Sequence, residues 1–437
     1  MYILEPKKLI FLLNLSLILL PVSLLLSNFI SETLILIIIY FFFLIAKKKD
    51  LLEALNNRII ILLLILTFYL ILNYLLNIDK NPSITRSFLF IRFPLYVIAL
   101  NYFLNSGLIN NRNIFYFWGV IIFLTCLDLQ LQSITGQNIF GYEYIREGGI
   151  LNQTGEFYGG IKRLGGFMND ELKISYLINS FFVISLGALA HYKKNNYHVI
   201  MIFLFTCVTF YSVYLTGERA NFLCLLIFII SFFLASNLKK YFLLIIFILI
   251  VLINFNNSEL KKNHLSERMI FKNIKTITNI LNTNTEKNKH FLNKENRYFS
   301  HYSTAWEIFK NYPIFGVGLK NFRVYCQNPI YKKNVPISLT NRNCTTHPHN
   351  LYFEILSELG ISGSIIFFSF FGYFFYICIK KSYRHKHIFL FGNTIFLMTY
   401  FIPFLPRGSF FTNWNAMIFW TLFAVTFHLL NTKKVDS

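Results

Sequence analysis

His349 is the residue whose type and position most clearly suggest chemistry, because it lies where a long polar segment meets a long apolar one. Asn350 follows it and can cap a helix, since its side chain can accept hydrogen bonds from the free N–H groups of the first turn. Leu351, Ile355 and Leu359 recur at four-residue steps, the spacing of one helix face. We therefore expect a short amphipathic helix on a membrane surface, with His349 at the boundary between water and lipid. A histidine in that position can accept a proton near neutral pH.

Two arginines lie where they could meet an anionic group. Arg219 follows Thr216 and Gly217 in a tight turn between two apolar runs. An arginine at a rigid helix end suits phosphate recognition, because the planar guanidinium matches two oxygens. Arg92 lies inside an apolar run, where a charge is costly and usually faces the interior of a helix bundle or a wet cavity. Both have simpler interpretations: Arg219 can pair with Glu218 or anchor at the interface, and Arg92 can extend to the lipid boundary.

Further charged residues border the same predicted face. Arg163 belongs to the glycine-rich loop 134–170. Glycine lets a ligand approach the backbone closely, although a plain turn has the same composition. Arg407, in the last loop of the chain, can add another positive charge to the site. Asp128, near the outer end of an apolar run, can carry a proton, but we expect it to pair with an arginine such as Arg92.

The composition indicates what kind of fold must position these residues. Hydrophobic residues make up 55% of the 437 residues, and the mean hydropathy is +0.51. A soluble protein rarely carries this much apolar surface. Many apolar runs reach the roughly 20 residues that cross about 30 Å of hydrocarbon, so we predict an all-α polytopic membrane protein with about 12 transmembrane helices. The predicted spans are residues 9–27, 33–46, 59–77, 86–104, 114–133, 171–192, 199–215, 220–236, 241–256, 361–379, 388–405 and 413–430.

The distribution of lysine and arginine predicts how this bundle is oriented. Basic clusters such as Lys47–Lys49 and Lys380–Lys381 mark one set of span ends, while the opposite short loops hold only scattered cations. By the positive-inside rule, both termini are cytoplasmic. The chain then divides into the first nine spans (1–256), a large loop with short helices on the opposite, external face (257–360), and the last three spans with a cytoplasmic tail (361–437). The first apolar segment is predicted to be a span rather than a cleaved signal, because it is long and lacks a small-residue cleavage site.

The external loop is basic, which contributes to the formal net charge of +21. An exported basic surface suggests an anionic partner such as lipid phosphates, a pyrophosphate or an acidic glycan, and we expect no nucleic acid on that face. A coding bias towards lysine and asparagine explains the lysines equally well. Helical spacing predicts short helices at 297–311 and 350–359, with a compact turn at 313–322. Cys326 and Cys344 can form a disulfide within the loop or remain free.

Taken together, these landmarks resemble the bacterial O-antigen ligase and O-antigen polymerase superfamily. The resemblance covers most of the chain from residue 127 onward, and its pieces fall in the family's order. Asp170-Glu171 stands after Asn169 in place of the usual Pro-Asn, so the resemblance is weaker at the Arg163 loop. The motifs that carry it are His349-Asn350 with Glu358, Gly360 and Gly363; Pro313-x-x-Gly316-x-Gly318 preceded by Arg297; Thr216-Gly217-Glu218-Arg219; Thr135-Gly136 to Gly141; Arg163 to Asn169; and Phe410-Phe411-x-Asn413-Trp414.

The resemblance implies an integral inner-membrane glycosyltransferase of the GT-C type, with an active site that faces the periplasm. It implies that a glycan is taken from an undecaprenyl-pyrophosphate donor, with no metal, nucleotide or other cofactor. Carried over by position, the family's two essential external arginines fall on Arg219 and Arg297, and its essential histidine falls on His349. We therefore expect these three residues to be catalytic.

A mechanism follows from the leaving group and the acceptor. A departing pyrophosphate needs fixed positive charge, which Arg219 and Arg297 can supply with help from other arginines. His349 can take the proton of a sugar hydroxyl as that oxygen attacks the anomeric carbon, so we predict inversion by a single displacement. The residues predicted to bind substrate are Arg92, Arg163, Arg407 and Asn350.

The acceptor and the class of activity remain open at this point. We favour ligation to lipid A-core, because the order of elements is that of a ligase, while repeat-unit polymerisation and O-glycosylation of a protein use the same chemistry. A solute transporter would also have many spans, but it should show an internal repeat and broken spans in corresponding halves. A metal pair of His347 and His349 lacks an evident third ligand. The enzyme hypothesis requires His349 and the arginines to converge in space.

Overall fold

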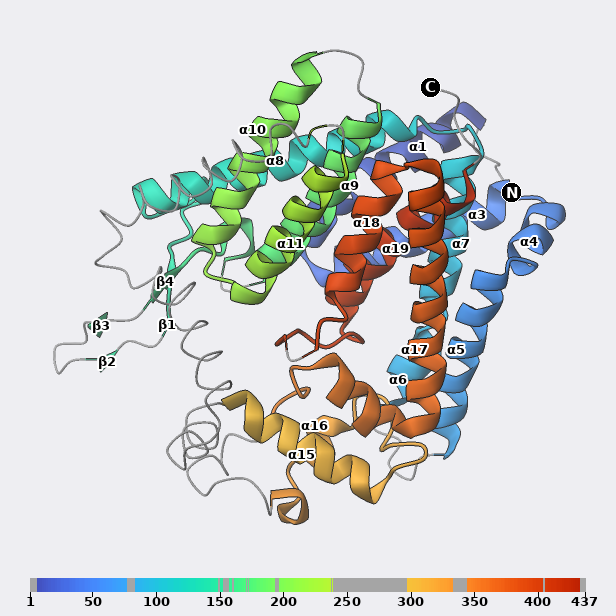
Figure 1. Ribbon diagram of the computed structural model, residues 1–437, viewed down its shortest axis with the longest axis vertical. Helices are drawn as coiled ribbons and strands as arrows, with labels where there is room; N and C mark the ends of the chain where they lie inside the picture. The colour runs from blue at the N-terminus through green and yellow to red at the C-terminus, as the bar shows by residue number, and fades with distance from the viewer. Residues whose placement is uncertain are drawn as a thin grey trace.

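The computed structural model describes residues 6–76, 83–147, 150–151, 157–158, 161–169, 171, 173–192, 196–236, 238, 297–332, 344–403 and 405–432. In this part of the chain the protein is a bundle of helices from which one segment with two short strand pairs projects (Figure 1). The first helices are α1 (Pro6–Ile18), α2 (Leu20–Leu26), α3 (Asn28–Ile45), α4 (Lys48–Leu55), α5 (Arg58–Leu76), α6 (Ser83–Leu89), α7 (Arg92–Asn105) and α8 (Asn111–Thr135).

Two antiparallel strand pairs follow α8, and the remaining helices come after them. Strand β1 (Ile145–Glu147) pairs with β4 (Ile161–Arg163), and β2 (Ile150–Leu151) pairs with β3 (Phe157–Tyr158). The later helices are η1 (Gly166–Met168), α9 (Ile174–His191), α10 (Asn196–Leu215), α11 (Arg219–Ala235), α15 (Arg297–Asn311), α16 (Phe322–Tyr325), η4 (Pro329–Lys332), α17 (Leu351–His385), α18 (Ile388–Thr399) and α19 (Asn413–Asn431).

Seven helices in the described part of the chain are long and apolar enough to cross a membrane: α3, α5, α7 with the end of α6, α8, α9, α10 and α17. Helices α1 and α2 are bent by 53° at their junction and add an eighth span if they count as one. Helices α11 and α18 are apolar but shorter. The chain is therefore a multi-pass membrane protein. The count of about 12 spans stays a prediction, and its segment 241–256 lies outside the described residues.

Helices α9 and α19 form the centre of the bundle. Every residue of α9 from Ile174 to Leu189 is buried, as expected of a helix that is apolar on all sides. Helix α19 packs against α7, α9 and α18 and buries Trp420. Phe371 of α17 and Phe410, from the loop before α19, both lie against the Trp420 ring. The loop that carries Arg407 is thus anchored in an aromatic core.

A separate layer, which we call the cap, consists of residues 297–332 and 344–350. It contains α15, α16, η4 and the segment before α17. In Figure 1 the cap lies at the lower end of the molecule, below the long helix α17, which runs beside α5. The predicted helix over 297–311 is confirmed as α15. Cys326 and Cys344 form a disulfide, with their Cα atoms 5.1 Å apart. Of the two alternatives, a disulfide or two free cysteines, the structure shows the disulfide.

Helix α17 changes direction at Gly360, whose backbone lies in the left-handed region (φ 65°). The turn after α15 is bonded to this kink through backbone groups. Val317 N–H donates to Ser357 O over 3.0 Å on one side of the kink, and Ile361 N–H donates into the turn over 2.8 Å on the other. A Cβ on Gly360 would lie 2.3 Å from a backbone oxygen of the turn, so a side chain does not fit there. The predicted short helix 350–359 that runs into a span is confirmed.

Candidate functional site

His349 lies at the end of the cap, directly before α17. Its backbone is in the left-handed region (φ 59°), which is uncommon for a residue with a Cβ. Its ring lies near those of Tyr298, His301 and His347, with centroids 5.5, 5.4 and 4.2 Å away. Tyr298 and His301 belong to α15, which therefore forms one wall around His349. Arg297 begins α15, one turn before His301, so the cap brings its backbone to the same side of the site.

Asn350 caps α17, as predicted from the sequence. Its Oδ1 accepts hydrogen bonds from the N–H groups of Tyr352 (2.9 Å) and Phe353 (3.3 Å), and the side chain is buried. Because this oxygen satisfies two free groups of the first turn, Asn350 sets the direction in which the helix leaves His349.

Arg407 connects the start of α17 with α11. Its backbone N–H donates to the carbonyl oxygen of His349 over 2.9 Å. Its guanidinium is buried and donates to Asn221 Oδ1 (3.4 Å) in the first turn of α11 and to Thr399 O (2.7 Å) at the end of α18. It also lies over the ring of Tyr400, 5.1 Å from the centroid. Arg407 is therefore close to the candidate site, but its side chain is engaged in holding helices together.

Arg219 is the first residue of α11, and its side chain is partly buried. We call residues 216–221 the Arg219 turn. Glu218 in this turn accepts hydrogen bonds from Ser175 N–H (3.1 Å) and from the side-chain amide of Asn221 (2.6 Å). Burial raises the pKa of Glu218, and the hydrogen bonds oppose that rise. The carboxylate thus fixes the first turn of α11, from which Arg219 projects.

Arg163 reaches the Arg219 turn from strand β4, where it pairs opposite Ile145 of β1. Its side chain is buried, and Nε donates to the carbonyl oxygen of Thr216 over 3.2 Å. The structure therefore gathers Arg163, Arg219 and Arg407 around one turn. Through Arg407 it connects that turn to His349.

Arg92 lies in a second polar cluster, at the start of α7. Its guanidinium donates to Asn413 Oδ1 (3.1 Å) and lies 3.8 Å from Glu32 Oε1. Arg86 also donates to the Asn413 oxygen. These contacts join the ends of α3, α7 and α19. The substrate-binding role of Arg92 stays a prediction.

The predicted pairing of Asp128 with an arginine such as Arg92 is wrong. Asp128 accepts hydrogen bonds from Ile139 N–H (3.0 Å) and from the side-chain amide of Asn138 (3.4 Å). Both donors belong to the turn that follows α8, which folds back onto the end of the helix. Local backbone and amide groups therefore satisfy the carboxylate, and within the described residues no arginine pairs with it.

Sequence reasoning missed a buried charged cluster between the cap and the loop before α19. Lys320 is 3% exposed; its Nζ lies 3.7 Å from Glu354 Oε1 and donates to Ser409 Oγ. Glu354 is 1% exposed and accepts from the Ser409 hydroxyl and from Phe410 N–H (3.1 Å). The backbone N–H of Lys320 donates to Glu358 Oε2 over 2.8 Å. Burial lowers the pKa of Lys320, and the two carboxylates oppose that shift.

His347 is held in one neutral form beside His349. Its Nε2 lies 3.3 Å from the carbonyl oxygen of Arg407, which can only accept, so Nε2 carries the proton. Nδ1 then accepts from the Thr346 hydroxyl (2.9 Å). Burial, with the positive charge of Lys320, lowers the pKa of His347 to about 3. His347 is therefore uncharged at neutral pH, with both ring nitrogens engaged.

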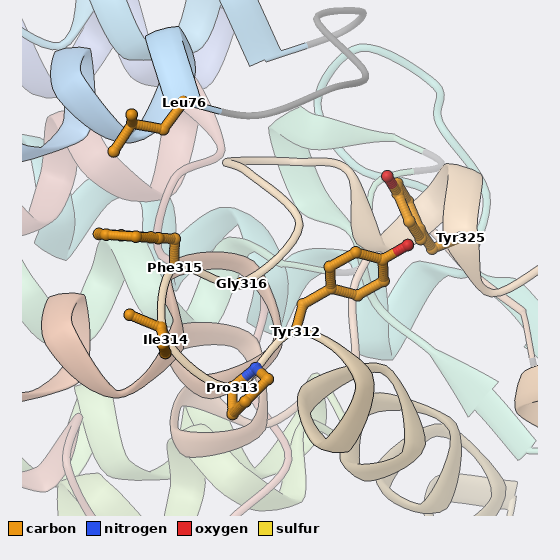
Figure 2. Close-up of a pocket in the computed structure, with 7 residues that line it drawn as sticks. All are labelled: Leu76, Tyr312, Pro313, Ile314, Phe315, Gly316 and Tyr325. Carbon is orange, nitrogen blue, oxygen red and sulfur yellow. The ribbon is translucent and has the colours of Figure 1, made fainter.

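A cavity of about 230 Å³ lies at the end of α5. Figure 2 shows Leu76 and Phe315 on one side of it and the rings of Tyr312 and Tyr325 on the other. Its lining comes mainly from apolar groups of the turn after α15 and includes neither His349 nor the arginines around the Arg219 turn. The cavity is thus separate from the candidate site.

Residues 201–368 match the family model described as O-antigen ligase. No curated protein matches the chain. The matched segment includes the Arg219 turn, α15 and His349, whereas Arg163 and Arg407 lie outside it. This match over part of the chain supports the resemblance to the O-antigen ligase and polymerase superfamily that the sequence motifs indicated.

Proposed function

We propose that this protein moves a glycan from an undecaprenyl-pyrophosphate donor to a sugar hydroxyl of lipid A-core, at the periplasmic face of the inner membrane. Its main support is the contact path from His349 to the Arg219 turn. The His349 carbonyl accepts from Arg407 N–H at 2.9 Å, and the Arg407 guanidinium donates to Asn221 at 3.4 Å. One arginine thus connects the proposed base to the turn proposed to meet the leaving group. The O-antigen ligase match over 201–368 supports the reaction class.

The positive charge of the site is proposed to stabilise the leaving group. Negative charge grows on the pyrophosphate as its bond to the sugar breaks, and a fixed cation stabilises that charge without reorganising during the reaction. We assign this role to Arg219 and Arg297. Arg163 and Arg407 are bonded within the protein, so we propose that they hold the Arg219 turn and add to its positive potential. Arg92 is proposed to contribute at longer range.

His349 is proposed to act as the general base. The acceptor oxygen forms a bond to the anomeric carbon, the bond from that carbon to the pyrophosphate oxygen breaks with its electron pair, and the hydroxyl proton goes to the imidazole. A base in position accelerates such a step by about 10²–10⁴-fold. A single displacement of this kind inverts the anomeric centre and needs no metal or nucleotide.

Complementation of a strain that lacks its own O-antigen ligase tests this proposal. Wild-type protein is compared, at matched expression, with His349→Ala, Arg219→Ala and Arg297→Ala. We expect full-length polysaccharide ladders from the wild type and none from the three variants. The matched controls are His385→Ala and Arg384→Ala, which change exposed residues of the same types at the far end of α17 and should restore ladders.

Each other outcome has a defined meaning. Ladders that survive His349→Ala would remove the proposed base. If well-expressed wild type gives no ladder but lengthens the glycan on its lipid carrier, the acceptor is a second repeat unit. If the glycan appears on a protein, the acceptor is a protein hydroxyl.

A further inference from the structure

Three buried polar residues join three separate parts of the candidate site. Lys320 belongs to the cap, Glu354 to the start of α17 just beyond His349, and Ser409 to the loop that carries Arg407. We call Lys320, Glu354 and Ser409 the buried triad. We propose that the buried triad is a positioning unit that fixes the Arg407 loop against the cap and so keeps His349 in place relative to the Arg219 turn. This inference rests on the proposed function.

The geometry of the triad suits positioning better than it suits stabilisation. Moving two charges out of water costs more free energy than their attraction commonly returns, so apolar residues of the same size are often equally stable. The 3.7 Å between Lys320 Nζ and Glu354 Oε1 is longer than a direct charged hydrogen bond. Instead, the Ser409 hydroxyl accepts from the lysine and donates to the glutamate. Two charges are thus used to orient one hydroxyl group.

Glu354 controls the loop through two adjacent groups. It accepts from the Ser409 hydroxyl and, over 3.1 Å, from Phe410 N–H. Arg407 lies two residues before Ser409 and gives its backbone N–H to His349 and its guanidinium to the Arg219 turn. A shift of this loop therefore moves both ends of the contact path together. A misplacement of about 1 Å can cost an enzyme on the order of 10²-fold in rate.

Lys320 connects the cap to the other two residues of the buried triad. Its backbone lies in the left-handed region (φ 65°), and its N–H donates to Glu358 Oε2 over 2.8 Å. Its Nζ also reaches Thr412 Oγ1 at 3.4 Å, directly before α19. A non-glycine residue keeps such a backbone conformation where the surrounding contacts determine it. The lysine thus spans from the turn after α15 to the start of α19.

Two double variants separate positioning from stability. Lys320→Met with Glu354→Leu removes both charges and leaves Ser409 and Phe410 N–H without their acceptor. Lys320→Met with Glu354→Gln also removes both charges, but the amide can accept from Phe410 N–H and donate to Ser409 Oγ. We expect the glutamine variant to unfold near the wild-type temperature. The leucine variant should unfold at a lower temperature, because two buried groups lose their acceptor, so kcat is compared at a temperature where all the proteins are folded. The leucine variant should lose about 10–100-fold in kcat with KM for the donor changed by less than about 3-fold, and the glutamine variant should keep its kcat.

Lys310→Met is the matched control, because it breaks the Glu307–Lys310 pair at the exposed lysine in the last turn of α15 and should leave kcat unchanged. Spin labels at positions 324 in the cap and 223 in α11, where the side chains are 44% and 43% exposed, measure the geometry independently of catalysis. Their distance distribution should broaden in the leucine variant and stay narrow in the glutamine variant.

Wild-type kcat in the leucine variant would overturn the positioning role, and so would an equal loss in both double variants. If the wild type transfers no glycan, the proposed function fails. The spin-label distances then test by themselves whether the buried triad is a positioning unit. A broadened distribution in the leucine variant then supports a positioning unit, and an unchanged one overturns it.

Discussion

The backbone N–H of Arg407 lies 2.9 Å from the carbonyl oxygen of His349, although the two residues belong to segments on either side of α17 and α18. The same arginine places its guanidinium against Asn221 and Thr399. The backbone contact does not depend on the side chain. A change of side chain at this position therefore tests the contacts of the guanidinium with α11 and α18 while the bond to His349 is kept.

Arg407→Lys should keep the bond to His349 and lose the two-pronged contact with Asn221 and Thr399, because an ammonium group cannot present a planar pair of donors. We expect the free energy of unfolding to fall by about 1.5–3 kcal/mol and glycan transfer to fall by at least about 10-fold. Thermal unfolding and a transfer assay measure the two effects. Arg384→Lys, on the exposed end of α17, is the control, and a wild-type transfer rate in Arg407→Lys would contradict the role of this contact.

His349→Asn should fold normally and lose activity. Asparagine adopts the left-handed backbone (φ 59°) of this position more easily than most residues, so the loop geometry is kept while the base is removed. We expect transfer to fall by about 10²–10⁴-fold with little change in the thermal midpoint. His349→Ala, with the same chemical loss but a less suitable backbone preference, should unfold at a lower temperature. Residual transfer near the wild-type rate in the asparagine variant would exclude His349 as the base.

Gly360→Ala should destabilise the protein, whereas Gly372→Ala in the same helix should not. A Cβ on Gly360 would lie 2.3 Å from Ile314 O, at a backbone φ of 65°, while a Cβ on Gly372 meets nothing within 4 Å. We expect a loss of at least about 2 kcal/mol at Gly360 and a gain of about 0.5–1 kcal/mol at Gly372. Thermal unfolding of the two variants side by side measures the difference. Equal midpoints would show that the kink does not need its glycine.

His347 should make the stability depend on pH below neutrality. The folded protein keeps its pKa at about 3, whereas an unfolded histidine has a pKa of about 6.5. Between these values the unfolded chain binds a proton that the folded chain does not, so the free energy of unfolding falls as the pH is lowered, by up to about 1.4 kcal/mol per unit. His347→Gln should flatten the dependence of the thermal midpoint on pH. The exposed control His385→Gln should leave it unchanged, and identical slopes in both variants would contradict the assignment.

The local elements of the fold could be predicted from the sequence because their signals are local. The Asn350 cap, the four-residue apolar spacing after it and the stop at Gly360 specify a helix within a few residues. The bend between α1 and α2 could not be predicted from hydropathy, since the whole segment is apolar. Pro21 in the first turn of α2 was the available signal for this break.

The site was predictable only in part, because its contacts join residues far apart in the chain. Glu354 and Glu358 are visible in the sequence as a charged stripe, and such a stripe usually faces solvent. Its burial depends on Lys320 and Ser409, which reach it from two other segments. Likewise, nothing next to Arg407 in the sequence indicates that its guanidinium is taken up by α11 and α18.

The turn after α15 is held against the kink of α17 by bonds between backbone groups, and the close approach depends on two glycines, Gly316 and Gly360. Because these bonds use backbone groups, they do not depend on which side chains the cap exposes to solvent. The exposed residues of the cap can therefore change while the cap stays attached to the helix bundle. For protein engineering, this joint is a natural boundary at which to exchange caps between related chains, provided that position 320 keeps its contacts with Glu354 and Ser409.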